Sequence, residues 1–92
     1  MMTFRCEFGG GVACEVRAPD RPPRGRSRSV ARIEWTGRPT PAIIPQYIAW
    51  MNSVNETCAN QWKMKFVHAY LKPDGRTELW AYEPGKPPER LK

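Results

Sequence analysis

The chain has 92 residues, with 15 Lys and Arg against 9 Asp and Glu, so its formal charge is +6 and its isoelectric point is near 9.7. This length allows one domain. A composition of 40% hydrophobic and 11% aromatic residues suffices for a compact core and argues against a disordered chain. The longest uncharged stretch, residues 39–55, is interrupted by Pro41 and Pro45, which excludes a transmembrane helix there. Residues 1–7 contain no apolar run long enough for a signal peptide, so we expect a cytoplasmic location.

Two alternating runs, separated by three glycines at residues 9–11, open the chain. Every second residue of each run is apolar, which is the pattern of half-buried strands. A three-residue glycine loop between them pairs Phe8 with Val12, Cys6 with Cys14, and Phe4 with Val16. The same register sets Arg5 opposite Glu15 on the other face, a favourable cross-strand pair. The sequence therefore predicts an antiparallel hairpin.

Residues 18–28 carry three prolines among Arg, Ser and Gly. Such a segment lacks backbone donors and has no apolar side chains to bury, so we expect a mobile loop. Alternation returns from Ser29 to Trp35, which predicts a third strand.

The next segment predicts one tight turn over residues 41–44 and a main helix from Pro45 to about Gln61. Its apolar positions follow helical spacing: Tyr47, Met51, Val54, Cys58 and Trp62. The opposite face is polar yet almost uncharged; its residues are Gln46, Ala49, Asn52, Ser53, Glu56, Thr57 and Asn60. A charge-poor face is compatible with a partner or self-association surface, or with an ordinary solvated face.

A second hairpin closes the domain, with its turn at Lys72-Pro73-Asp74-Gly75-Arg76. Its register pairs Leu71 with Thr77, Ala69 with Leu79, Val67 with Ala81 and Lys65 with Glu83 on one face; the other face pairs Tyr70 with Glu78, His68 with Trp80 and Phe66 with Tyr82. Prolines at 84, 87 and 88 predict a flexible tail over residues 84–92. The fold class is α+β, in the order β-β-β-α-β-β. We expect residues 1–83 to form one domain, a mostly antiparallel sheet of about five strands with one amphipathic helix packed on one face.

The aromatic face of this last hairpin has two interpretations. If it is exposed, Phe66, Trp80 and Tyr82 are candidates for stacking on nucleic-acid bases. If it covers the helix, the same rings form part of the core. The pair of Lys65 and Glu83 on the opposite face favours the second interpretation, because charge pairs usually face water.

Arginine is concentrated between residues 17 and 32, where six arginines are opposed only by Asp20. Guanidinium groups suit phosphate and carboxylate partners, since each offers a bidentate fork of donors and stays charged. The candidate residues for binding nucleic acid or another anion are Arg21, Arg24, Arg26, Arg28 and Arg32. An acidic protein surface and plain solvent exposure remain alternatives for this segment.

Cysteine and histidine spacing gives no reason to expect a metal, a cofactor or a catalytic centre. Cys6, Cys14 and Cys58 form no Cys-x-x-Cys pair, and His68 is the single histidine. Cys6 and Cys14 lie within disulfide reach across the first hairpin. In a reducing compartment, however, we expect small buried hydrophobic residues there.

The sequence therefore predicts a small binding module without enzymatic activity, and its function is otherwise unassigned. One hypothesis is contact with nucleic acid or another polyanion through the Arg-rich loop. The alternative is a protein-interaction or adaptor domain, or a homodimer, that uses the uncharged helix face or a sheet edge. We expect no membrane partner.

Overall fold

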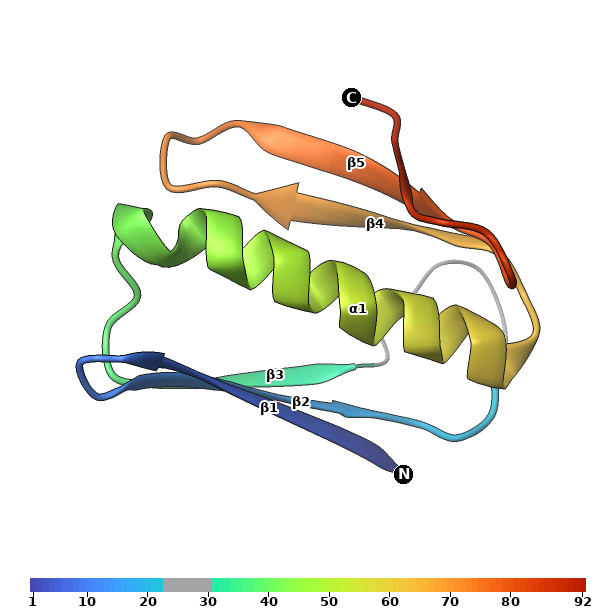
Figure 1. The fold of residues 1–92 in the computed structure, drawn as a ribbon, viewed down its shortest axis with the longest axis horizontal. Coiled ribbons are helices and arrows are strands. Elements are labelled where there is room, and N and C mark those ends of the chain that lie inside the picture. Colours follow the sequence, from blue (N-terminus) through green and yellow to red (C-terminus); the bar gives the residue numbers. More distant parts are fainter. Residues whose placement is uncertain (23–30) are drawn as a thin grey trace.

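The computed structural model describes residues 1–22 and 31–92 (Figure 1). In these residues the chain forms, in order, β1 (Met2–Gly9), β2 (Val12–Ala18), β3 (Arg32–Thr36), a 3₁₀ turn (Pro41–Ile43), α1 (Ile44–Trp62), β4 (Phe66–Leu71), β5 (Thr77–Tyr82) and β6 (Glu89–Arg90). The α+β class predicted from the sequence is confirmed. Residues 23–28 of the predicted mobile loop lie outside the described residues, while Ala18 at its start is the buried last residue of β2.

The strands form two antiparallel three-stranded sheets and not the single sheet of about five strands that the sequence predicts. One sheet has the order β1-β2-β3 and the other has the order β4-β5-β6, and α1 runs between them in Figure 1. Two sheets form because each hairpin has an apolar face of its own, and one face of a single helix cannot cover the apolar surface of both hairpins. Facing the two sheets toward a shared core, with the helix against both, buries both faces.

The first hairpin has the predicted pairs Phe4–Val16, Arg5–Glu15 and Cys6–Cys14, and Arg5 lies 3.8 Å from the Glu15 carboxylate. Its end differs from the prediction, because Gly9 and not Phe8 pairs with Val12. The register shifts between Glu7 and Gly9, a bulge that the positive φ angles of the three glycines permit.

Gly37, just after β3, has a φ of +75°. A Cβ atom at this position would lie 2.6 Å from the backbone oxygen of Gly11, so the close approach of these two segments requires glycine.

Every predicted pair of the second hairpin between residues 66 and 82 is confirmed. In its turn, Gly75 has a φ of +83° and donates its N–H to the oxygen of Lys72. Within the segment that the sequence predicts to be a flexible tail, Arg90 pairs with Trp80 in β6 and Leu91 donates its N–H to the oxygen of Leu79 at 2.7 Å. The prolines precede this short strand and do not interrupt it.

The helix agrees with the prediction of a tight turn followed by one long helix. It ends at Trp62, and Lys63 caps it in the left-handed conformation, with a φ of 56°. At this end of α1, the Trp62 Nε1 donates a hydrogen bond of 2.7 Å to the oxygen of Pro19, which ties the helix to the segment after β2.

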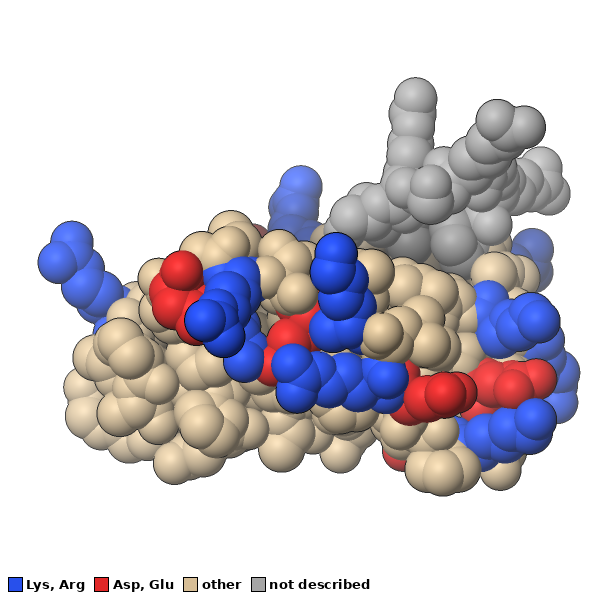
Figure 2. All heavy atoms as spheres, turned by 90° about the horizontal axis from the view of Figure 1, so that it is seen from above, with Lys and Arg blue, Asp and Glu red and all other residues tan. Residues whose placement is uncertain are grey.

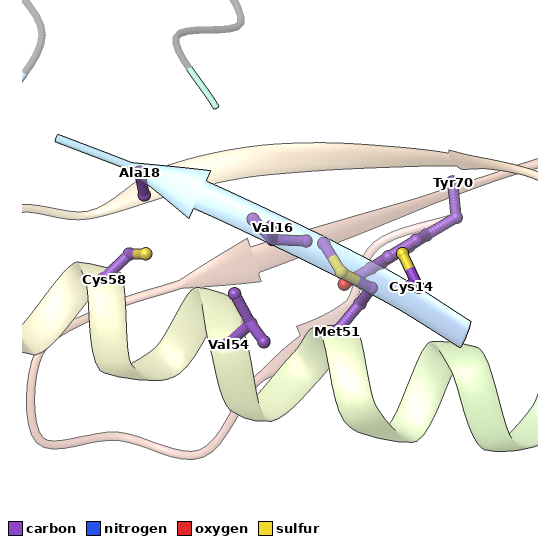
Figure 3. Close-up of a cluster of buried hydrophobic side chains, with 7 residues drawn as sticks. All are labelled: Cys14, Val16, Ala18, Met51, Val54, Cys58 and Tyr70. Atoms are coloured by element: carbon purple, nitrogen blue, oxygen red, sulfur yellow. The ribbon is translucent and has the colours of Figure 1, made fainter. Parts of the chain in front are cut away.

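The core lies where β2, α1 and β4 meet, as Figure 3 shows. Its buried side chains are Cys14, Val16 and Ala18 from β2, Met51, Val54 and Cys58 from α1, and Tyr70 from β4. At the start of the helix a second group of rings packs beside it, in which the centroids of Trp35 and Tyr47 are 5.1 Å apart and those of Phe8 and Trp35 are 5.9 Å apart.

Candidate interaction surface

The aromatic face of the second hairpin is turned toward the helix and the core. Tyr82 is 1% exposed, and Phe66 and Trp80 are half-buried against the core cluster. The rings of Phe66 and Tyr82 stack on each other at 5.2 Å, and Phe66 also packs against Trp62. Stacking on bases requires these rings to be exposed. In the structure, however, Tyr82 lies in the core, and Phe66 and Trp80 pack against the core.

A buried polar network joins this face to α1. The hydroxyls of Tyr70 and Tyr82 are 2.6 Å apart, and both donate to Oδ1 of Asn52, at 3.0 and 2.6 Å. Asn55, which is 7% exposed, donates from Nδ2 to the Tyr70 hydroxyl at 2.9 Å. Burial raises the pKa of both tyrosines, so both hydroxyls keep their protons and hold the helix on the sheet. Sequence reasoning missed this role, because it placed Asn52 on the solvated face.

Glu78 is the one buried carboxylate in the described part of the chain, at 5% exposure. It forms ion pairs with Lys72 and, at 3.4 Å, with Arg90, and it accepts a hydrogen bond of 3.1 Å from Trp80 Nε1. The hydrogen bond from Lys72 is the main reason that the pKa of Glu78 lies below its usual range. This cluster fastens β6 to β5, and its carboxylate is held in ion pairs with Lys72 and Arg90.

The histidine and the cysteines behave as packed side chains. His68 lies edge-on to Tyr70 at 4.7 Å, and burial lowers its pKa, so that it is neutral at pH 7. All three cysteines are free thiols, and burial raises the pKa of Cys14 and of Cys58 to about 11. Within residues 1–22 and 31–92, no three potential ligands gather to hold a metal ion.

The arginine candidates are only partly described. Arg21 and Arg32 are exposed at the two ends of the gap, whereas Arg24, Arg26 and Arg28 lie outside the described residues. Arg17 is bound to Glu15 through a hydrogen bond of 2.8 Å. Figure 2, which views the molecule from the side of β4 and β5, shows basic and acidic side chains interleaved in a band with uncharged surface beside it.

The face of β4 and β5 that points away from the core carries a group of apolar side chains, with the charged Glu89 of β6 beside Ala81. We call it the outer surface; it consists of Val67, Ala69, Leu71, Leu79 and Ala81. Val67 is 58% exposed and Leu71 is 75% exposed. The sequence pattern had assigned these residues to one face, opposite the aromatic rings.

A groove of about 380 Å³ adjoins the outer surface at Leu71. Its walls come from β3, the start of the helix and the second turn, and include Trp35, Tyr47 and Pro73. Sequence reasoning missed the groove, because its walls meet only when the two sheets face each other.

No family model, no curated protein and no solved structure matches this chain. In the described ranges, no helix has both the length and the apolar character to cross a membrane.

Proposed function

We propose that this protein is a small non-enzymatic binding module that associates with protein through the outer surface of β4 and β5. The observation that carries the proposal is the exposure of Val67 and Leu71, two large aliphatic side chains on a sheet face that the core does not use. Contiguous exposed apolar surface is rare on monomers and is typical of sites that another protein covers. The five residues form an apolar centre with the charged Glu89 of β6 beside Ala81 at its border, and an apolar centre with a polar rim fits a protein partner better than a polyanion.

The sheet supports this proposal better than the helix face does. Part of the polar helix face is already engaged, since Asn52 binds both tyrosine hydroxyls and Asn60 Oδ1 accepts a hydrogen bond of 3.0 Å from the N–H of Gly85. The exposed remainder includes Gln46, Ala49, Ser53 and Thr57, and Thr57 donates to the oxygen of Ser53 within the helix. These residues offer little apolar area to a partner.

Contact with a polyanion through the Arg-rich segment is a second candidate. Its support is the charge: the described residues contain twelve Lys and Arg against nine Asp and Glu, and residues 23–30 add three more arginines. Phosphate contacts through Arg21, Arg24, Arg26, Arg28 and Arg32 would be electrostatic and not selective for bases. Binding of single-stranded DNA or RNA, measured by mobility shift, should then fall steeply between 50 and 200 mM salt; absence of binding at 50 mM excludes this candidate.

We also propose a reducing, cytoplasmic setting. Cys6 and Cys14 face each other across the first hairpin as free thiols. An oxidising compartment favours a disulfide between two cysteines placed in this way.

Site-specific photo-crosslinking tests the main proposal. A photoreactive amino acid replaces Leu71 on the outer surface or, as the matched control, Thr3 on the exposed side of β1. The proposal predicts a protein adduct from position 71 in the cells of origin and none from position 3. If position 71 yields no protein adduct, or if both positions yield the same adducts, the proposal is wrong.

A further inference from the structure

The open edge of the second sheet is β4. Among the described residues β4 pairs only with β5, and β5 pairs with β6 on its other side. An edge strand presents a row of backbone donors and acceptors, and proteins usually protect such edges with charged residues or proline. The edge strands β1 and β3 follow this rule, with Arg5 and Glu7 in one and Arg32 and Glu34 in the other.

The six residues of β4, Phe-Val-His-Ala-Tyr-Leu, include no Lys, Arg, Asp, Glu or Pro. β6 is also an edge, but it is two residues long and both residues are charged. Among the sheet edges formed by residues 1–22 and 31–92, β4 is therefore the one that lacks the usual protection against pairing with another strand.

The hydrogen-bond pattern shows which residues of β4 face this open edge. Lys72 donates its N–H to the oxygen of Arg76, and in an antiparallel ladder the residues that bond to the partner strand alternate with residues that do not. Counting back from Lys72, residues 70, 68 and 66 bond to β5. The N–H and C=O groups of Val67, Ala69 and Leu71 therefore point away from β5.

The contacts of β6 give the same assignment independently. Leu79, the partner of Ala69, uses its N–H and its C=O to bond to Lys92 and Leu91 beyond β5. It is thus not hydrogen-bonded to Ala69, whose backbone groups must point to the opposite, open side. The three residues that face the edge with their backbones are the same three that expose their side chains on the outer surface.

We propose that a second copy of this chain pairs with β4 in antiparallel orientation, about a two-fold axis at Ala69. The inference rests on the proposed function, because it names the partner of the outer surface. In this register Ala69 faces Ala69 of the other copy, and Val67 faces Leu71 of the other copy on the outer side. All edge-facing backbone groups of both strands are then matched, and each facing pair exchanges two hydrogen bonds.

The sequence selects this register over its neighbour. A two-fold axis at His68 would match Val67 with Ala69 but set Leu71 against Lys65 of the other copy, which lies outside β4. The register about Ala69 instead gives aliphatic pairs, and the two outer surfaces become one continuous apolar strip across a six-stranded sheet. A closed two-fold pairing of this kind also uses up the edge and stops at two copies.

The contact is small, because it consists of one strand edge and its flanking side chains. Interfaces at this end of the size range are weak, so we expect a dissociation constant on the order of 10 μM. Sedimentation velocity of the full chain from 1 to 300 μM should show a shift from the 10.6 kDa monomer to twice that mass.

Two variants test the edge. Ala69→Pro removes an N–H that the monomer does not use and should raise the dissociation constant about 30-fold, since two hydrogen bonds at the axis are lost. Leu71→Lys places a charge against Val67 of the other copy and should abolish the dimer at 300 μM. Thr3→Lys makes a similar change of charge on β1, which belongs to the other sheet, and should leave dimerisation unchanged.

The outcomes separate this inference from the proposed function. A wild-type chain that stays monomeric at 300 μM overturns the second-copy inference, as does a dimer that survives Leu71→Lys. Circular dichroism checks that each variant is folded. If Ala69→Pro does not fold, Leu71→Lys alone tests whether a second copy pairs with β4. If position 71 crosslinks to a different protein and the wild-type chain is monomeric, the second-copy inference is wrong and the proposed function stands. If position 71 crosslinks to no protein, the proposed function is wrong.

Discussion

The buried network between α1 and the second sheet predicts unequal effects from two similar substitutions, Tyr70→Phe and Tyr82→Phe. Each removes one hydroxyl from the core without changing its shape. In Tyr82→Phe, Asn52 Oδ1 keeps its hydrogen bond from Tyr70, and the Tyr70 hydroxyl keeps the donor Asn55. In Tyr70→Phe, Nδ2 of the buried Asn55 loses its partner on β4.

The magnitudes follow from this difference. Tyr82→Phe should lower the free energy of unfolding by about 1–2 kcal/mol, because hydrogen bonds are lost and no polar group is left unpaired. Tyr70→Phe should lower it by about 2–4 kcal/mol, because it adds the desolvation penalty of an unpaired amide. In a domain of this size, a difference of 1 kcal/mol shifts the melting temperature by roughly 4–8 °C.

Urea unfolding followed by tryptophan fluorescence gives both values, and the double variant provides the control. Because the two hydroxyls contact each other at 2.6 Å, the double variant should cost less than the sum of the single variants. Equal effects of the two single variants, or strict additivity, would contradict the network described above.

Three further predictions concern the backbone and His68. Gly37→Ala should lower the free energy of unfolding by about 2–4 kcal/mol in urea unfolding, because the new Cβ meets the Gly11 backbone. Gly10 also has a positive φ, but open space surrounds it, so Gly10→Ala should lower the free energy of unfolding by only about 1 kcal/mol. Lys63→Gly should raise the free energy of unfolding by about 0.5–1 kcal/mol, since glycine adopts the left-handed cap without strain, and a loss of stability would refute this. Burial lowers the pKa of His68 in the folded state, so His68 binds a proton more readily in the unfolded chain. The free energy of unfolding should therefore fall as the pH drops from 7.5 to 5.5. His68→Gln should reduce this pH dependence.

Local pattern sufficed for most elements of this fold. The alternation of residues 66–71 and 77–82, joined by a Pro-Asp-Gly turn, determined the register of the second hairpin pair by pair. The predicted pair of Lys65 with Glu83 lies just beyond the paired residues of the two strands, and the prediction from it, that the aromatic face is the buried one, agrees with the 1% exposure of Tyr82. Local pattern does not show how the two hairpins lie relative to each other. Their division into two sheets depends on how much apolar surface each hairpin must bury.

The candidate site is likewise predictable from the sequence only in part. Val67, Ala69 and Leu71 were placed on one face by their spacing alone, whereas the position of β4 at an open edge depends on the sheet order. The pairing of the chain end with β5 was missed, because the prolines before it suggest an irregular tail. The role of Asn52 was missed because polar side chains on a helix are usually solvated, and only the approach of Tyr70 and Tyr82 gives it buried partners.

The most direct measurement is amide hydrogen exchange of β4, followed by NMR at low and high protein concentration. The amides of His68 and Tyr70 bond to β5, so they should be protected at both concentrations. The amides of Val67, Ala69 and Leu71 should exchange rapidly in dilute protein and roughly five- to tenfold more slowly at 300 μM, where a dissociation constant on the order of 10 μM leaves about one chain in eight monomeric. Rapid exchange of these three amides at both concentrations would contradict the claim that a second chain covers this edge.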